Sequence, residues 1–151
     1  MPMDAELRAI YNYLPLSSRI ATSGQPTAQQ IQAIAEAGFE VVINLALPTS
    51  DNALINEKEL VETTGMRYVQ IPVVWEQPTE ANLASFLHAM TMYESQRVFI
   101  HCAANMRVSV FMALYRIRSL GWSRDDAMQM VYEIWQPNEI WSRFIEQNLR
   151  E

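Results

Sequence analysis

Cysteine and histidine are scarce in this sequence, with one Cys (Cys102) and two His (His88 and His101) among 151 residues. A single cysteine excludes an intrachain disulfide, and no CxxC, HExxH or histidine cluster is present to hold a metal. The sequence also shows no signal peptide and no apolar run of membrane-spanning length. We therefore expect a cytoplasmic protein that binds no metal or cofactor and has no membrane partner.

Basic residues are also few, with 11 Lys and Arg against 17 Asp and Glu and a formal net charge of −6 at pH 7. Because binding to a phosphate backbone requires a basic face, this balance argues against a nucleic-acid partner. An anionic ligand would depend on a locally positive pocket rather than on long-range attraction. Half of the residues are hydrophobic, so we expect a single globular domain over residues 1–151.

Apolar periodicity and turn signals divide the chain into alternating strands and helices. Strands are expected at 19–23, 40–45, 67–72 and 98–100. Helices are expected at 1–14, 27–38, 57–64, 79–90, 108–120, 123–136 and 138–149. This alternation indicates right-handed βαβ units, and the predicted fold class is α/β with a central, mostly parallel sheet of four to five strands flanked by helices. Ligands of such sheets bind beyond the carboxyl ends of the strands.

The segment 98–109 places the only cysteine at a turn between a buried strand and a buried helix. Free N–H groups converge at a helix N-terminus, and the helix dipole stabilises a thiolate placed there. Arg107, five positions after Cys102, could fold back over the same point and bind a tetrahedral oxyanion. This pattern predicts a phosphate site that presents a thiolate. The alternative is a core residue, because free cysteine is among the most buried residue types.

His101, Cys102, Arg107 and Ser109 together resemble the signature of the cysteine-dependent phosphatases of the tyrosine and dual-specificity type. That signature has five residues between Cys and Arg, with Gly third after Cys. Here four residues intervene and Asn105 stands in place of the Gly. Because Ser109 keeps the family distance from Cys102, Arg107 falls one position early, about 100° around a helix. Asn tolerates positive φ better than most residues, so we expect Asn105 to take the conformation of the Gly.

The order of the flanking segments extends this resemblance. A loop at 73–78 with Trp75 and Glu76 precedes a helix and the cysteine strand, as the acid-bearing loop does in the dual-specificity phosphatases. The turn Ser-Gly-Gln-Pro-Thr at 23–27 is similar to a bacterial phosphatase group of undefined function, related to β-lactamase-hydrolase-like fusion proteins. The resemblance covers roughly residues 17–120 and implies a protein tyrosine phosphatase-like fold. We expect Trp75 to pack in the core.

The resemblance implies covalent phosphoryl transfer. Cys102 would attack phosphorus, and Glu76 would protonate the leaving oxygen and later activate water. Arg107 and the loop amides would hold the equatorial oxygens. His101 would point into the protein and favour the thiolate, and Ser109 would hydrogen-bond the Cys102 sulfur. The implied substrate-binding residues are Ala103, Ala104, Asn105, Met106, Arg107, Val108 and Ser109.

Two other functions stay open from the residues alone. A shortened loop could keep the amides and Arg107 yet lose in-line geometry, which would leave a non-catalytic module that binds phosphate or sulfate. Sulfur transfer uses a similar cysteine loop, whereas arsenate reduction usually requires a second thiol that this chain lacks. The expected partner is a phosphorylated substrate or a free phosphate- or sulfate-like anion. The natural substrate and the oligomeric state do not follow from the sequence.

Overall fold

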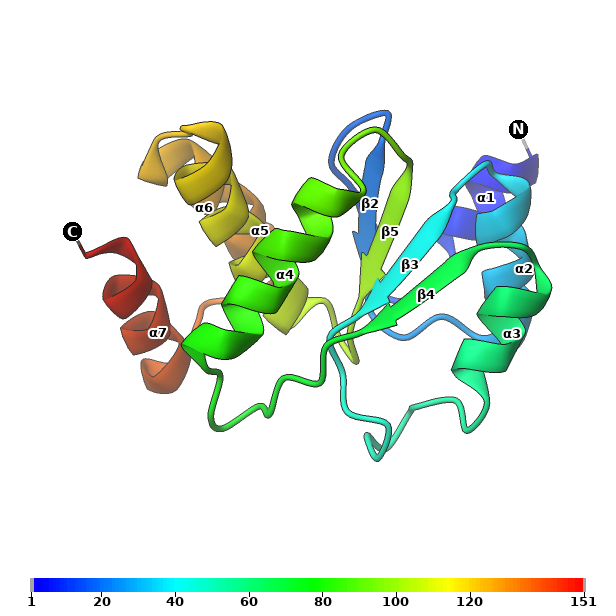
Figure 1. The fold of residues 1–151 in the computed structure, drawn as a ribbon, viewed down its shortest axis with the longest axis horizontal. Helices are drawn as coiled ribbons and strands as arrows, with labels where there is room; N and C mark the ends of the chain where they lie inside the picture. Colours follow the sequence, from blue (N-terminus) through cyan, green and yellow to red (C-terminus); the bar gives the residue numbers. More distant parts are fainter. Residues whose placement is uncertain (1, 151) are drawn as a thin grey trace.

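The computed structural model describes residues 2–150, and its centre is a five-stranded sheet with the order β1-β2-β5-β3-β4 (Figure 1). The strands are β1 (Leu14–Pro15), β2 (Ile20–Ser23), β3 (Val41–Asn44), β4 (Arg67–Gln70) and β5 (Val98–His101). β1 is antiparallel to β2, and the other neighbouring strands are parallel. The expected α/β fold with a mostly parallel sheet is confirmed.

Seven helices connect and follow these strands in residues 2–150. They are α1 (Pro2–Arg8), α2 (Ala28–Glu36), α3 (Glu57–Thr63), α4 (Glu80–Met92), α5 (Met106–Leu120), α6 (Arg124–Ile134) and α7 (Glu139–Leu149). The prediction of a helix over 1–14 is wrong beyond Arg8, because Asn12 adopts a left-handed conformation (φ 50°) and the chain turns into β1. None of these helices combines the length and apolar character that a membrane crossing requires.

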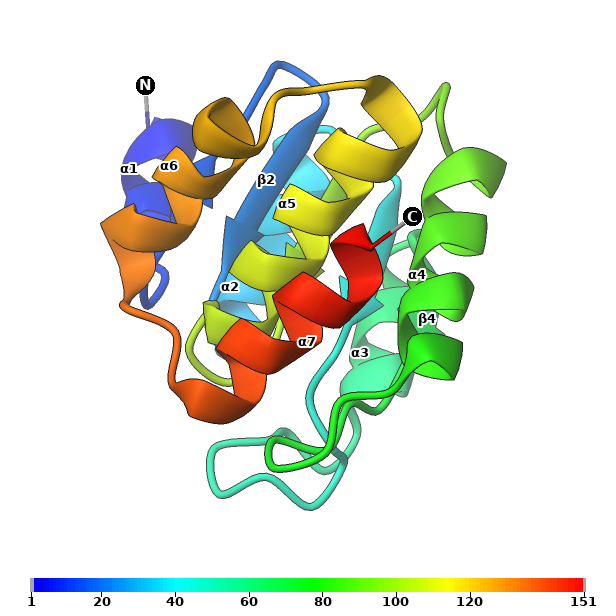
Figure 2. The same cartoon turned by 90° about the vertical axis from the view of Figure 1, so that its left-hand side faces the viewer.

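Helices cover both faces of the sheet, α1 to α3 on one face and α4 to α7 on the other (Figures 1 and 2). Side chains of a strand alternate between faces, so Val42 and Phe99 pack in the first layer, and Ile43 and Ile100 pack in the second. β5 is paired on both edges and buried on both faces. This position explains why its sequence is uniformly apolar up to His101.

Side-chain caps begin the helices where the sequence predicts them. Thr27 and Gln30 form a complete capping box at α2, and the Ser123 hydroxyl accepts a hydrogen bond from the Asp126 amide at α6. Such caps are each worth about 1 kcal/mol. The Thr27 cap fixes where the loop that follows β2 at the carboxyl edge of the sheet ends.

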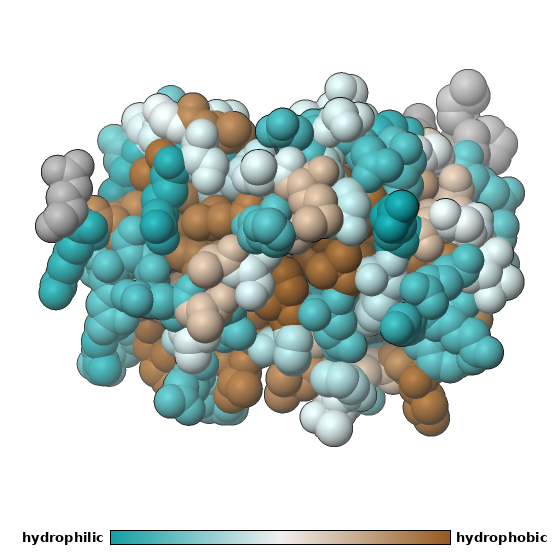
Figure 3. Space-filling view, in the orientation of Figure 1, coloured by the Kyte–Doolittle hydropathy of each residue, from teal (hydrophilic) through white to brown (hydrophobic). Residues whose placement is uncertain are grey.

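One face of the molecule is hollowed between α4 and the edge strand β4. A cavity of about 450 Å³ lies there, with Val69, Ile71, Ala89 and Met92 among its lining residues. Figure 3 shows apolar surface near the centre of this face. The lining includes no residue of the segment 101–109, so this hollow is separate from the cysteine loop.

Candidate active site

The cysteine loop lies at the carboxyl end of the central strand. β5 is parallel to both β2 and β3, and His101 lies opposite Ser23 on one side and Asn44 on the other. Cys102 follows immediately, and the 15-residue helix α5 begins at Met106. The loop therefore occupies the edge of the sheet where parallel α/β folds bind their ligands.

Cys102 and Arg107 line the same cavity. Its volume is about 230 Å³, and its walls are Trp75, Cys102, Ala103, Ala104, Met106 and Arg107. Both side chains are well enclosed, since Cys102 is 1% exposed and Arg107 is 6% exposed. Cys102 and Arg107 thus line one cavity. They do so although four residues separate them here, one fewer than in the signature that the sequence resembles.

The backbone carbonyls of the loop are hydrogen-bonded by segments outside the cavity. Asn12 Nδ2 donates to the Ala104 carbonyl (3.0 Å), and Asn52 Nδ2 donates to the Ala103 carbonyl (3.2 Å). The Gln25 amide also donates to the Ala103 carbonyl (3.1 Å). Because a peptide unit is planar, these contacts fix the orientation of the loop peptides. Free amides at the start of a helix can bind an anion, and this loop leads into α5.

Asn105 lies in the left-handed region, with φ 65° and ψ 3°, at the N-cap of α5. The expectation that it adopts the conformation of a glycine is therefore confirmed. Its side chain also adds contacts that a glycine cannot make, because Nδ2 donates to the Asn12 carbonyl (2.9 Å) and to Thr22 Oγ1 (3.0 Å). Asn105 thus ties the loop to β2 and to the turn after α1.

We expect Asn105→Ala to lower the free energy of unfolding by about 2–4 kcal/mol, because Ala is strained at positive φ and both buried hydrogen bonds are lost. Asn105→Gly should cost clearly less, since glycine removes the hydrogen bonds but not the favourable conformation. Urea unfolding of the two variants measures the difference. Equal losses would mean that the positive φ contributes nothing to the stability of the loop.

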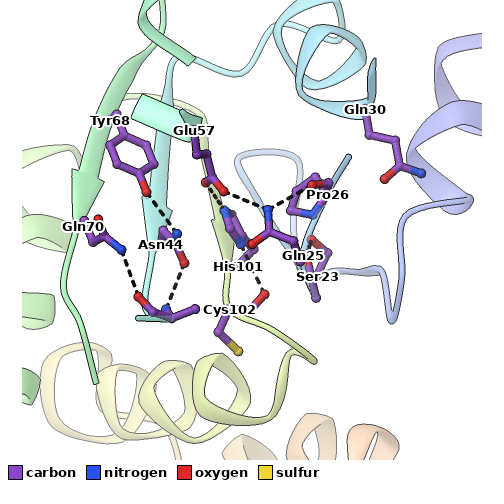
Figure 4. Close-up of polar contacts among 12 residues, drawn as sticks. Ser23, Gln25, Pro26, Gln30, Asn44, Glu57, Tyr68, Gln70, His101 and Cys102 are labelled. Atoms are coloured by element: carbon purple, nitrogen blue, oxygen red, sulfur yellow. Dashed lines mark hydrogen bonds and ion pairs between the residues drawn. The ribbon is translucent and has the colours of Figure 1, made fainter. Parts of the chain in front are cut away.

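His101 is fully buried behind the loop and contacts two acceptors (Figure 4). Its Nε2 lies 2.5 Å from Glu57 Oε2, and its Nδ1 lies 3.3 Å from the Cys102 carbonyl. Gln25 Nε2 donates to the other carboxylate oxygen of Glu57 (2.8 Å). Sequence reasoning missed Glu57, because an acidic residue in the first turn of a helix is ordinarily explained by the helix dipole.

Arg107 and Ser109 make contacts that the sequence did not predict. Arg107 Nη1 donates to the Val73 carbonyl (2.8 Å), which joins the cysteine loop to the segment after β4. The Ser109 hydroxyl donates to the Met106 carbonyl (2.6 Å) and accepts from Trp135 Nε1 (3.0 Å). A hydroxyl has one proton, so the expected hydrogen bond from Ser109 to the Cys102 sulfur is not made.

Only some of the predicted substrate-binding residues line the cavity. Val108 is fully buried and lies outside the cavity lining, and the Ser109 amide is used by the Asn105 carbonyl (3.0 Å) within α5. Asn105 itself faces β2 rather than the cavity. Of the predicted residues, Ala103, Ala104, Met106 and Arg107 line the cavity beside Cys102.

Trp75 and Glu76 are adjacent in sequence but lie at different cavities. Trp75 lines the cysteine cavity and also packs against Trp135 (ring centroids 5.3 Å apart) and Trp141 (5.7 Å). Its expected packing against the core is confirmed, and it also lines the cavity. Glu76 is exposed and lines a separate cavity with Arg143 of α7. Glu76 is absent from the residues that line the cysteine cavity, and its role as the acid stays a prediction.

Comparison of the sequence with known proteins identifies a family and a related protein. The family model described as "DSP-PTPase phosphatase fused to NAD+ Kinase" matches residues 13–139. The β-lactamase hydrolase-like protein of Xylella fastidiosa (strain Temecula1) is 28% identical over 114 residues, which are 74% of this chain. The chain spans only 26% of the length of that protein.

Comparison with solved structures identifies the fold. A presumed phosphatase (DUF442) from Shewanella putrefaciens CN-32 is 30% identical, with a TM-score of 0.87 and coverage of 95% of each chain. TpbA of P. aeruginosa, solved in complex with pTyr, is 18% identical, with a TM-score of 0.69 and coverage of 89% of this chain and 82% of TpbA. The protein tyrosine phosphatase-like fold expected from the cysteine motif is confirmed.

Proposed function

The chain belongs to the family described as DSP-PTPase phosphatase fused to NAD+ kinase, and from this premise we propose that it hydrolyses phosphate monoesters through a phosphoryl-cysteine at Cys102. The observation that carries the proposal is the cavity that Cys102, the loop residues Ala103 and Ala104, and Arg107 line together. Turnover of p-nitrophenyl phosphate by the wild-type protein, and its loss in Cys102→Ser, is the direct test.

In the proposed reaction the Cys102 thiolate attacks phosphorus opposite the leaving oxygen. The S–P bond forms as the bond from phosphorus to the leaving oxygen breaks. Water then attacks phosphorus, the S–P bond breaks, and inorganic phosphate leaves with the thiolate restored. The amides of the loop and Arg107 stabilise the charge on the three equatorial oxygens in both steps.

The cavity suits a leaving group that needs little help from an acid. None of its six lining residues is a carboxylate, and its walls include the Trp75 ring, Met106 and two alanines. TpbA, which shares this fold, is solved with phosphotyrosine, an aryl phosphate. An aryl group would pack on the apolar walls, and a phenolate leaves more readily than an alkoxide. We therefore propose aryl phosphates as the preferred substrate class.

We expect kcat/KM to be at least about 10²-fold higher for p-nitrophenyl phosphate than for phosphoserine, the magnitude that a missing general acid commonly costs. Glu76→Gln should change kcat less than about threefold on either substrate, because Glu76 does not line the cavity. Steady-state kinetics with both substrates provide the measurement. A large loss in Glu76→Gln confined to phosphoserine would restore Glu76 as the acid.

A non-catalytic phosphate-binding module is the second candidate. The absence of a carboxylate among the residues that line the cavity favours it, as does the short spacing between Cys102 and Arg107. Such a module would bind phosphate or sulfate without turning over any ester. Anion binding together with an absence of turnover on aryl phosphates would identify it.

A further inference from the structure

A buried carboxylate contacts His101, the residue that precedes Cys102. Glu57, the first residue of α3, is 5% exposed, and His101 is 0% exposed. Their side chains meet at 2.5 Å, and Figure 4 shows the imidazole between Glu57 and the Cys102 carbonyl. Burying a carboxylate without a partner is costly, so this contact satisfies a requirement of the fold as well as of the site.

Both ring nitrogens of His101 face oxygen atoms that can accept a hydrogen bond. Nε2 faces the Glu57 carboxylate, and Nδ1 faces a backbone carbonyl. Opposite an ionised carboxylate, a neutral imidazole has one N–H and would leave one of these contacts without a proton. A doubly protonated ring donates to both acceptors, and the carboxylate compensates its charge.

Two other polar residues interact with Glu57. Gln25 Nε2 donates to Oε1 of the carboxylate, at 2.8 Å. On β4, burial and then the negative charge of Glu57 raise the pKa of Tyr68 to about 12, so the phenol stays neutral. Cys102 and Arg107 are the ionisable residues among those that line the cavity.

We propose that Glu57 is a positioning residue that keeps His101 doubly protonated, and that the resulting Nδ1–H orients the Cys102 carbonyl and stabilises the Cys102 thiolate. The carbonyl held by Nδ1 turns the Ala103 amide toward the cavity, because the two groups of a trans peptide point in opposite directions. The positive charge of the imidazolium lies one peptide from the sulfur-bearing residue, where it favours the thiolate. The inference rests on the proposed function, but it concerns the state of the thiol before any substrate binds.

Nuclear magnetic resonance of the wild-type protein tests the protonation state without any substitution. Correlation of the ring nitrogens with the ring protons distinguishes an imidazolium from each neutral tautomer, and His88 on the exposed surface of α4 supplies the second signal. We expect both nitrogens of His101 to be protonated at pH 7. A neutral ring at that pH would overturn the proposal.

Alkylation by iodoacetamide tests the consequence for the thiol, and the only cysteine makes the readout specific to Cys102. We expect Glu57→Gln to raise the midpoint pH of alkylation by about one unit, which slows alkylation at pH 6 about tenfold. Glu62→Gln, an exposed position on the same helix, is the matched control and should follow the wild-type curve.

A midpoint in Glu57→Gln that equals or falls below that of Glu62→Gln would overturn the proposal. Neither readout requires catalysis. A protein that shows the imidazolium and the shifted alkylation curve but no turnover would therefore contradict the proposed function and leave this inference standing.

Discussion

Replacing Cys102 with serine is expected to lower kcat on p-nitrophenyl phosphate by at least about 10⁴-fold, the scale of loss seen when a covalent nucleophile is removed. A serine hydroxyl is not ionised at neutral pH, whereas the thiol at the start of α5 is placed where negative charge is favoured. The substitution is nearly isosteric, so the buried position tolerates it. Steady-state release of p-nitrophenolate measures the effect.

Anion binding is the control for this variant. Cys102→Ser should bind phosphate or sulfate within a few-fold of wild type, because the amides and Arg107 remain in place. Circular dichroism and thermal unfolding establish that the fold is kept. Turnover that survives in Cys102→Ser would exclude the phosphoryl-cysteine, and a wild-type protein without turnover would favour the binding module.

Arg107→Ala is expected to weaken the binding of phosphate, sulfate or vanadate by about 1.5–3 kcal/mol, the usual worth of hydrogen bonds to a charged group. Among the residues that line the cavity Arg107 is the one cation, and the protein as a whole carries a net charge of −6. Arg107→Lys should recover only part of the loss, because an ammonium cannot reproduce the planar fork of the guanidinium. Calorimetric titration of the three proteins measures the affinities.

Arg118→Ala, at an exposed position on the same helix, is the matched control and should leave anion affinity unchanged. The Val73 carbonyl loses its partner when Arg107 is truncated, so the thermal stability of Arg107→Ala must be measured alongside its affinity. If folded Arg107→Ala binds the anion as tightly as wild type does, the guanidinium does not hold the ligand.

The sequence alone determined the order of the elements, the parallel sheet and the place of the cysteine loop. These features follow from local signals: apolar runs, caps such as Thr27 with Gln30, and a residue tolerant of positive φ at Asn105. Each of these signals lies within a short stretch of residues, so it can be recognised from the sequence alone. The N-terminal segment shows the limit, because its helical spacing continued past Asn12 while the chain turned back to pair with β2.

Only the tertiary structure decided which side chains meet at the loop. Glu57 is 44 residues from His101, and Asn12 is 92 residues from the carbonyl that it holds. The contacts of the Ser109 hydroxyl with Trp135 Nε1 and the Met106 carbonyl were likewise decided by the tertiary structure. Contacts of this kind depend on how layers pack and on which rotamer a crowded side chain can adopt, and neither leaves a periodic trace in the sequence.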